Sequence, residues 1–307
     1  MPESPNIDKD SNRILGLNRN VFFLGITSLL TDVSSEMIFT LVPLFVVNVL
    51  GASTIVVGLI GGLSESTDAI FRIFSGRLSD KIGKRKLLAV LGYGFSTIVK
   101  PLMYLVSSWG VVTAVRFSDR VGKGIRSSPR DALVADSVSA DERGKSFGVH
   151  RAIDTTGAVL GLAIAAFIIY VLQGGGLELS LKTYRWLVVV GTIPAVLAIM
   201  VLLGFVHEKG KRKPKHAGPQ SGFDTVIRDT GFDIRFKIFL VIIAVFSLGN
   251  FSEFFIVLRA QNLGAPVLYI TLMLVLFNIT YASVSVPAGV ISDKLGRRRV
   301  IALGWFI

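Results

Sequence analysis

The chain contains no cysteine and only three histidines among its 307 residues. Without cysteine it has no disulfide, no thiolate nucleophile and no thiolate metal ligand. The histidines, His150, His207 and His216, show no metal-ligand spacing. We therefore expect no metal and no other cofactor, and an integral-membrane enzyme, although conceivable as a class, has no nucleophile or metal motif to support it.

Acidic residues are scarce relative to basic ones. The chain has 21 aspartates and glutamates against 33 lysines and arginines, which gives a formal net charge of +12. Such an excess indicates nucleic-acid binding only where the basic residues share one solvated face. Here they stand between apolar runs. We therefore expect no nucleic-acid partner.

Long polar stretches are also few, since 51% of the residues are apolar and the mean hydropathy is +0.63. These values indicate a membrane protein with the lipid bilayer as its surroundings. Residues 1–20 are too polar for the apolar region of a signal peptide, and no small-residue cleavage site follows. We interpret them as an uncleaved cytoplasmic tail.

The apolar runs predict an all-α membrane protein. A bilayer core of about 30 Å needs roughly 20 apolar residues in a helix, and on this basis the chain has eight spans and a partial ninth over 300–307. The ninth is too short to cross, which predicts a fragment of a longer reading frame. The predicted spans are residues 21–50, 55–74, 87–109, 111–134, 148–172, 186–206, 238–258 and 268–290.

Lysine and arginine gather in the tail and in alternate loops, which predicts the orientation. Cytoplasmic loops hold the excess of these residues, so the amino terminus should face the cytoplasm, with the chain in the cell (inner) membrane. The longest loop, residues 207–237, is polar and basic, and it is predicted to be a linker between two membrane halves. Its later part, 223–236, suits either a short amphipathic surface helix or an irregular solvated loop.

One motif occurs twice in the chain. The run Gly76 to Lys86, GRLSDKIGKRK, follows the second predicted span, and the run Gly289 to Arg299, GVISDKLGRRR, follows the eighth. Glycine, aspartate, lysine, glycine and a basic triplet recur in register at the same point of each half. An internal repeat of this kind is typical of transporters built from two related bundles.

This pair resembles the GxLxDRxGRR signature of the major facilitator superfamily. The resemblance implies two pseudo-symmetric six-helix bundles around a central cavity, which rock between inward-open and outward-open states. On that pattern residues 21–206 form the N-terminal bundle, and residues 238–307 form a C-terminal bundle that is incomplete. Secondary active transport follows as the expected activity.

The repeated motif also has a physical interpretation as a conformational latch. Gly76 and Gly289 allow a neighbouring helix to approach closely, and Gly83 and Gly296 can take a left-handed turn. Asp80 and Asp293 can receive amides at a helix start or pair with arginine. A simple positive-inside turn would explain the basic residues alone. The latch set is Gly76, Asp80, Gly83, Arg85, Gly289, Asp293, Gly296 and Arg298.

Ionisable residues stand inside several predicted spans, where each costs several kcal/mol unless it is paired or hydrated. Helical spacing places Asp32 and Glu36 on one face, and it makes a local ion pair available between Asp68 and Arg72. We expect these groups to face a wet cavity or one another. The candidates for proton coupling and the substrate cavity are Asp32, Glu36, Glu65, Asp68, Arg116, Asp119, Arg120, Asp154 and Glu253.

Two weaker motifs bear on mechanism. The run from Arg116 to Gly122 is similar to the family's RxxxGxG proton-relay motif, with Arg120 in place of the first glycine; we expect this arginine to contact an anionic substrate, or Asp119 and a carboxylate of the first span. The run from Gly157 to Leu162 resembles the GxxxGP motif of the drug/proton antiporter branch, with leucine in place of proline. Gly157 and Gly161 also suit simple helix packing.

The leading hypothesis is proton-coupled efflux, or antiport, of a small solute by alternating access. Solute uptake by proton symport uses the same parts and stays open as an alternative. A further alternative is a membrane scaffold or sensor that has the transporter fold without transport. The expected partners are a small-molecule solute, protons and the bilayer, and a monomer is expected.

Overall fold

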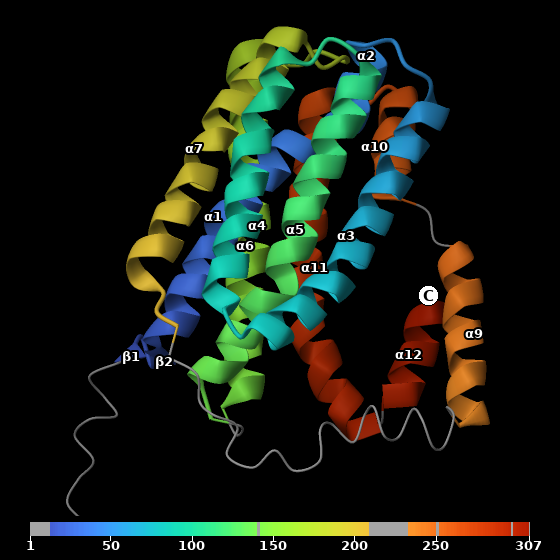
Figure 1. Ribbon diagram of the computed structural model, residues 1–307. Coiled ribbons are helices and arrows are strands. Elements are labelled where there is room, and N and C mark those ends of the chain that lie inside the picture. Colours follow the sequence, from blue (N-terminus) through green and yellow to red (C-terminus); the bar gives the residue numbers. More distant parts are fainter. Residues whose placement is uncertain (1–12, 140–141, 209–232, 250–251, 296, 307) are drawn as a thin grey trace, which may run out of the picture.

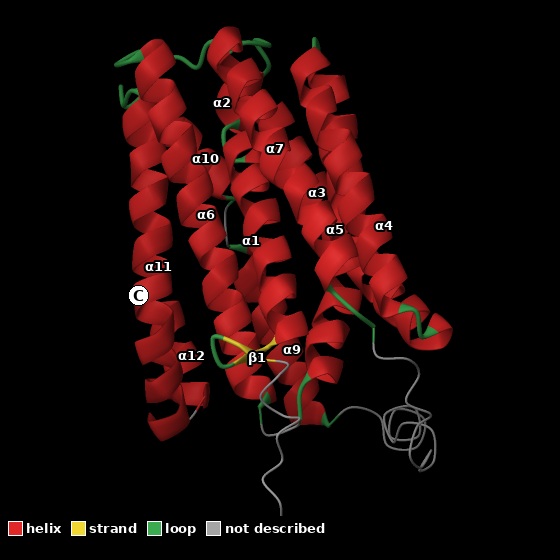
Figure 2. Ribbon diagram, turned by 90° about the vertical axis from the view of Figure 1, so that its left-hand side faces the viewer, coloured by secondary structure: helices red, strands yellow, loops and turns green. Residues whose placement is uncertain are grey.

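The computed structural model describes residues 13–139, 142–208, 233–249, 252–295 and 297–306. Helices dominate, and the long ones run side by side along one direction, as Figure 1 and Figure 2 show. Among these residues the strands are β1, Arg13–Ile14, and β2, Leu17–Asn18, which pair antiparallel. The small hairpin leads directly into the first helix.

The first predicted span is divided into α1, Arg19–Phe39, and α2, Val42–Asn48. The helix is therefore interrupted between Phe39 and Val42, within the predicted span. Pro43 lies in the first turn of α2 and has no amide hydrogen to donate back into α1. The two helices together still form one candidate membrane span.

The second and third predicted spans correspond to α3, Thr54–Ile82, and α4, Arg85–Val99. Gly83 ends α3 with a φ of 68° and donates its amide to the Ser79 carbonyl at 2.8 Å. This is the left-handed turn that the sequence predicts at Gly83. After Val99 the chain tightens into the 3₁₀ helix η2, Lys100–Leu105, where Pro101 cannot continue the α-helical bonding.

The fourth to sixth predicted spans form α5, Trp109–Ser137, α6, Arg143–Gln173, and α7, Leu181–Phe205. Helices α5 and α6 extend beyond the predicted ranges at both ends, and α7 begins five residues before its range and ends one residue before the end of it. Hydropathy marks the apolar stretch of a helix, whereas the helix itself continues into polar residues at the membrane surface. The boundaries therefore differ by several residues.

In the second half the chain forms α9, Ile234–Leu248, α10, Glu253–Asn262, α11, Val267–Leu295, and α12, Arg297–Phe306. The predicted span over 238–258 is divided between α9 and α10. Ser252 caps the start of α10, and its hydroxyl accepts the Phe254 amide hydrogen at 3.3 Å. Residues 209–232 of the predicted linker lie outside the described residues.

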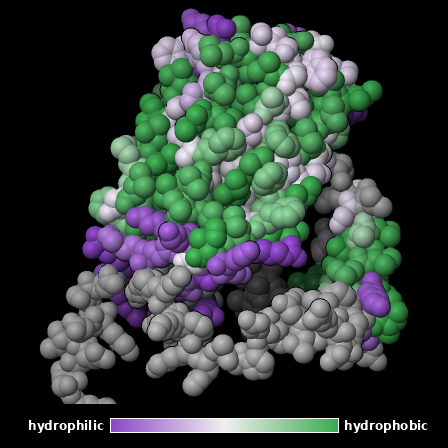
Figure 3. Space-filling view, viewed as in Figure 1, coloured by the Kyte–Doolittle hydropathy of each residue, from purple (hydrophilic) through white to green (hydrophobic). Residues whose placement is uncertain are grey.

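Six described segments are long and apolar enough to cross a membrane. Charged residues keep α5 out of this group, and α9 and α10 are each too short for it. The apolar side chains exposed on the long helices form a broad hydrophobic surface above a hydrophilic lower end in Figure 3. A surface of this kind suits contact with lipid rather than water.

Packing divides the first bundle into two groups of helices. Helix α1 packs against α6 and α7, whereas α5 packs against α3 and α4. The second half joins this bundle through α11, which lies along α6, and through α10, which contacts α2 and α3. At the α10 contact a Cβ on Gly58 would lie 3.1 Å from Phe255, and one on Gly61 would lie 3.4 Å from Phe254.

Candidate functional site

Glycines on both flanks of α5 bring its charged residues close to α3 and α4. A Cβ on Gly122 would lie 2.8 Å from the Gly92 carbonyl oxygen of α4. A Cβ on Gly124 would lie 2.6 Å from the Phe71 Cβ of α3. Real Cβ atoms do not approach so closely, so any larger residue would push the helices apart. The charged side chains of α5 are thereby held in the middle of the bundle.

Helices α1 and α6 are joined in the same way. A Cβ on Gly157 would lie 2.5 Å from the Leu29 carbonyl oxygen, and one on Gly161 would lie 2.6 Å from the Val33 carbonyl oxygen. Both glycines of the GxxxG run therefore lie where the backbone of α6 meets that of α1. This close packing places the polar residues of α1 beside those of α6.

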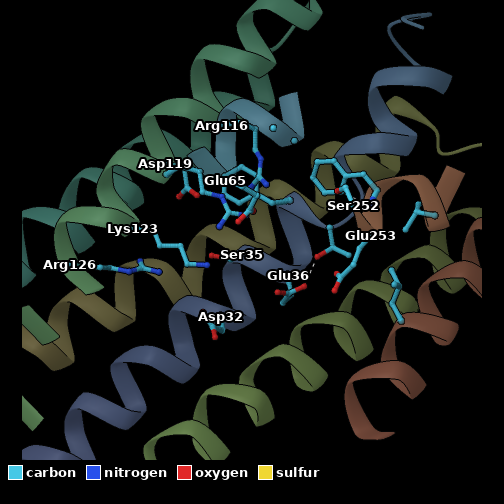
Figure 4. A pocket seen from close by; sticks show the side chains of 18 of the residues that line it. Asp32, Ser35, Glu36, Glu65, Arg116, Asp119, Lys123, Arg126, Ser252 and Glu253 are labelled. Carbon is cyan, nitrogen blue, oxygen red and sulfur yellow. Dashed lines mark hydrogen bonds and ion pairs between the residues drawn. The ribbon is translucent and has the colours of Figure 1, made fainter. Parts of the chain in front are cut away.

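A cavity of about 600 Å³ opens between α1, α3 and α5 on one side and the second half of the chain on the other. Figure 4 shows carboxylates and cations from α1, α3, α5 and α10 pointing toward this space. Such a concentration of charge at membrane depth requires water or a ligand in the cavity. Its charged lining residues are Asp32, Glu36, Glu65, Arg116, Asp119, Arg120, Lys123, Arg126 and Glu253.

A second cavity, of about 470 Å³, adjoins the first. The two share Asp32, Glu36, Glu65, Lys123 and Arg126 in their walls. The remaining charged groups of the second cavity come from α3, α5 and α6. They are Asp68, Arg72, Arg130, Asp131, Arg151 and Asp154.

The cavity residues predicted from the sequence all lie in the walls of these two cavities. Asp32, Glu36 and Glu65 line both. Asp68 and Asp154 line the second cavity only. Those that line the first cavity only are Arg116, Asp119, Arg120 and Glu253.

Two carboxylates of the second cavity have partners on their own helices. Arg72 and Asp68 form an ion pair with a nitrogen to oxygen distance of 2.7 Å, as their four-residue spacing predicts. Arg151 and Asp154 form another at 3.4 Å on α6. Both arginines are more exposed than their carboxylates, so these pairs lie at the edge of the cavity.

Arg120 makes a contact that the sequence does not predict. Its guanidinium pairs with Glu65 of α3 at 3.3 Å. The expected pairing with Asp119 or with a carboxylate of the first span is wrong, because the neighbouring helix supplies the carboxylate. Asp119 instead accepts a hydrogen bond from the Ser96 hydroxyl of α4.

Three cations of α5 have no ion pair with any described residue: Arg116, Lys123 and Arg126. The Arg116 guanidinium carbon lies 4.4 Å from the centre of the Phe39 ring. The Arg126 guanidinium carbon lies 4.4 Å from the centre of the Tyr93 ring. Aromatic faces thus hold the two arginines in place while leaving their hydrogen-bond donors available.

The two carboxylates of α1 differ in their surroundings. Asp32 lies close enough to Asp154 of α6 for one carboxyl group, when protonated, to donate a hydrogen bond to the other. Glu36, one turn further along, accepts a hydrogen bond from Thr40. Neither Asp32 nor Glu36 forms an ion pair with a described residue. Both are therefore available to a proton or to a positively charged ligand.

Lys100 is a buried charged residue that the sequence interpretation missed. Its side chain is 1% exposed, and its Nζ atom donates to the Ser34 and Ser35 hydroxyls at 3.0 Å each and to the Thr31 carbonyl at 3.4 Å. It therefore ties η2 to α1 behind the cavity wall. The available signal was a lone lysine within an apolar run, directly before Pro101.

The first copy of the repeated motif forms a polar cluster at the ends of α3, α4 and α5. The Arg85 side chain pairs with Asp80 at 3.7 Å, contacts Asp136 and donates to the Ala132 carbonyl at 3.1 Å. Its backbone amide donates to Glu208 at 2.7 Å. Arg85 is therefore the centre of a network that joins three helix ends to the chain after α7.

Gly76 lies beside Ser128 of α5, where an added Cβ would make an ordinary contact at 3.5 Å. In the second copy of the motif, Gly296 lies outside the described residues. The side chains of Gly289, Asp293 and Arg298 are also outside the described part of the chain. The structure thus shows the arrangement of the first copy only.

Comparison with known proteins agrees with this architecture. The sequence profile of the Major Facilitator Superfamily matches residues 24–258. An uncharacterized MFS-type transporter of Methanocaldococcus jannaschii is 36% identical over 310 residues, which cover 98% of this chain and 73% of that protein. The multidrug resistance protein MdtH of Edwardsiella ictaluri is 26% identical over 152 residues, which cover 48% of this chain and 37% of that protein.

The fold has solved counterparts. A bacterial homologue of the human lysosomal transporter Spinster, in an inward-facing and unoccupied conformation, aligns with a TM-score of 0.67 at 18% identity. The alignment covers 91% of this chain and 63% of that one. This likeness shows the fold.

The helical bundle and its charged cavity define a multi-pass membrane protein of the transporter class. The profile match and the archaeal relative show that the chain belongs to the Major Facilitator Superfamily. The family consists of secondary carriers rather than enzymes, and its all-α architecture is the one predicted from the repeated motif.

Proposed function

We propose that the protein exports a small solute by alternating access, in exchange for protons. The observation that supports this most strongly is the pair of carboxylates on one face of α1. Asp32 and Glu36 line both cavities and have no ion-pair partner among the described residues. A static structural carboxylate at this depth would be expected to have a cation beside it.

Exchange requires that proton and solute exclude each other. Protonation of the α1 carboxylates removes the negative charge that attracts a positive group on the solute, so each ligand weakens binding of the other. Asp32 faces Asp154, and one proton shared between the two carboxyl groups relieves their repulsion. The α1 carboxylates thus have a physical reason to bind and release a proton as the cavity changes.

Alternating access requires contacts between the halves that form at one end and open at the other. In this structure α10 contacts α2 and α3, while Figure 1 shows α9 and α12 standing clear of α3 at the end that carries the basic loop after Ile82. The positive-inside rule assigns that end to the cytoplasm of the cell membrane. We therefore take the cavity to be open to the cytoplasm, with the amino terminus on the same side.

In this scheme the Arg85 cluster is the cytoplasmic latch of the first bundle. Asp80 is largely exposed even though it pairs with Arg85, so it is available to a helix of the second bundle in the opposite state. The sequence division into a bundle at 21–206, a linker at 207–237 and a second bundle from 238 fits this motion. The similarity to MdtH over part of the chain supports efflux as the direction.

The test is proton release from energised, inverted bacterial membrane vesicles that contain the protein. A panel of cationic, zwitterionic, anionic and neutral solutes is added, and an internal pH dye reports the protons that leave. We expect at least one solute to release protons from vesicles with the wild-type protein, and Asp32→Asn and Glu36→Gln to abolish the signal. Glu178→Gln, in an exposed loop outside the cavity, is the matched control. Absence of any signal above empty vesicles, or unchanged coupling in both α1 variants, would contradict the proposal.

A further inference from the structure

Arg126 is buried, but some of its hydrogen-bond donors have no partner among the described residues. Only 4% of the residue is exposed, yet its Nε and Nη1 atoms have no hydrogen-bond partner among the described residues. Unsatisfied donors on a buried charged group are costly. The Tyr93 ring covers one side of the guanidinium, and the residue lines both cavities. Arg126 therefore borders a space that a ligand can enter, and its guanidinium still has hydrogen-bond donors without a partner.

Lys123 stands one turn before Arg126 and lines the same two cavities. Figure 4 shows both side chains on one side of the first cavity, with Glu36 and Glu253 on the other side. Because the two residues are three positions apart in a helix, the ammonium and the guanidinium lie on one face of α5. Together they present two positive charges to the cavity.

The nearby carboxylates do not form ion pairs with these cations. Asp119 accepts from Ser96, and the carboxylates of Asp68 and Asp154 are paired with arginines on their own helices. Asp32 lies on the opposite helix and faces Asp154. The pattern is therefore one of two cations beside carboxylates that form no ion pair with them, rather than a closed network of ion pairs.

We infer that Lys123 and Arg126 form a subsite for an anionic group, so that the exported solute is zwitterionic. The guanidinium can bind a carboxylate or a phosphate-type group with two parallel hydrogen bonds, and the ammonium adds a point charge. The positive group of the same solute then faces Glu36 and Glu253 across the cavity. This second part rests on the proposed function, in which the positive group and the proton exclude each other.

The experiment measures binding to the purified full chain in detergent, as a saturable increase in the thermal unfolding temperature at constant ionic strength. Four probes of similar size separate the charges: 4-aminobutyrate, butyrate, butylammonium and butyramide. We expect 4-aminobutyrate to bind most tightly. A parallel titration with 3-aminopropylphosphonate shows whether a carboxylate or a phosphonate is the better anionic group.

The variants isolate the subsite. Arg126→Gln and Lys123→Gln should each weaken binding of 4-aminobutyrate by about tenfold or more, the magnitude of a lost charge-assisted hydrogen bond, and Arg126→Lys should give a smaller loss. Two exposed cations in the first turn of α6 provide the controls, Arg143→Gln and Lys145→Gln, which should bind as the wild type does. If Arg126→Gln does not fold, Lys123→Gln and Arg126→Lys carry the test.

Two outcomes would overturn the inference. The first is a failure of both 4-aminobutyrate and 3-aminopropylphosphonate to bind the wild-type protein, or equal binding of these probes to the wild type and to the folded Lys123 and Arg126 variants. The other is a vesicle assay in which only solutes without an anionic group release protons, which would leave the proposed exchange intact and remove the zwitterion. Zwitterion binding without proton release by any solute would instead count against the proposed function alone.

Discussion

Asp32 of α1 and Asp154 of α6 face each other with their carboxyl groups within hydrogen-bond reach. The glycines at 157 and 161 allow this approach, because they bring the backbone of α6 against α1 directly beyond Asp154. Two like charges so close repel unless a proton lies between them. The packing of two helices therefore brings together two carboxyl groups that are far apart in the sequence.

If Asp32 and Asp154 hold a proton together, their substitutions should not be additive. Asp32→Asn should abolish solute-driven proton release, Asp154→Asn should reduce it strongly, and the double variant should be no worse than Asp32→Asn. The vesicle assay measures all three. Independent effects that multiply in the double variant would show that the two groups act separately.

The α1 to α6 contact predicts a sharp difference between two glycines of α6. Gly157→Ala places a methyl group 2.5 Å from the Leu29 carbonyl oxygen, so we expect a loss of about 1–3 kcal/mol in stability, the usual cost of overpacking. Gly148→Ala, in the same helix but with open space around it, should be neutral. The unfolding temperatures of the two variants in detergent provide the comparison, and equal values would refute the close contact.

The turn after α3 predicts a preference for residues that tolerate left-handed backbone. Gly83 has a φ of 68°, a region that costs an alanine about 1–2 kcal/mol. Gly83→Ala should therefore lower the unfolding temperature, whereas Gly83→Asn should lower it less because asparagine visits this conformation more readily. Indistinguishable variants would mean that the turn does not constrain the folded state.

Lys100 provides a test of buried charge. Lys100→Met keeps most of the side-chain volume and removes the need to solvate an ammonium group, so stability should be unchanged or higher. Lys100→Ala leaves a cavity and should cost about 2–4 kcal/mol. Thermal unfolding of both proteins checks the order. A Lys100→Met protein as unstable as Lys100→Ala would show that the three hydrogen bonds of the ammonium outweigh its burial.

The sequence predicts the fold well because membrane helices are long apolar runs, and because the repeated motif marks equivalent points of two halves. It does not predict the internal breaks. The average hydropathy of a span does not mark the breaks at Pro43, at the 3₁₀ turn that begins at Lys100, or at the start of α10 at Glu253. These breaks depend on local hydrogen bonding rather than on polarity.

The charged residues that line the cavities could be predicted from the sequence, whereas the ion pairs between helices could not. Any ionisable residue within a span must face water or a partner, which identifies the set. The partner of Arg120 depends on how α3 lies against α5, and helical spacing along one chain segment contains no information on that. Lys100 was missed because its partners are hydroxyls and a carbonyl, which give no charge pattern in the sequence.

The central claim is that the charged cavity is an aqueous passage, and the absence of cysteine allows it to be tested without background. Gly62 lines the first cavity, and Gly94 lies on α4 in line with the exposed apolar Leu91 and Ile98. Both have open space for a side chain. A water-soluble thiol reagent applied from the cytoplasmic side should modify Gly62→Cys rapidly and leave Gly94→Cys unmodified. Equally slow modification of the two variants would contradict the account.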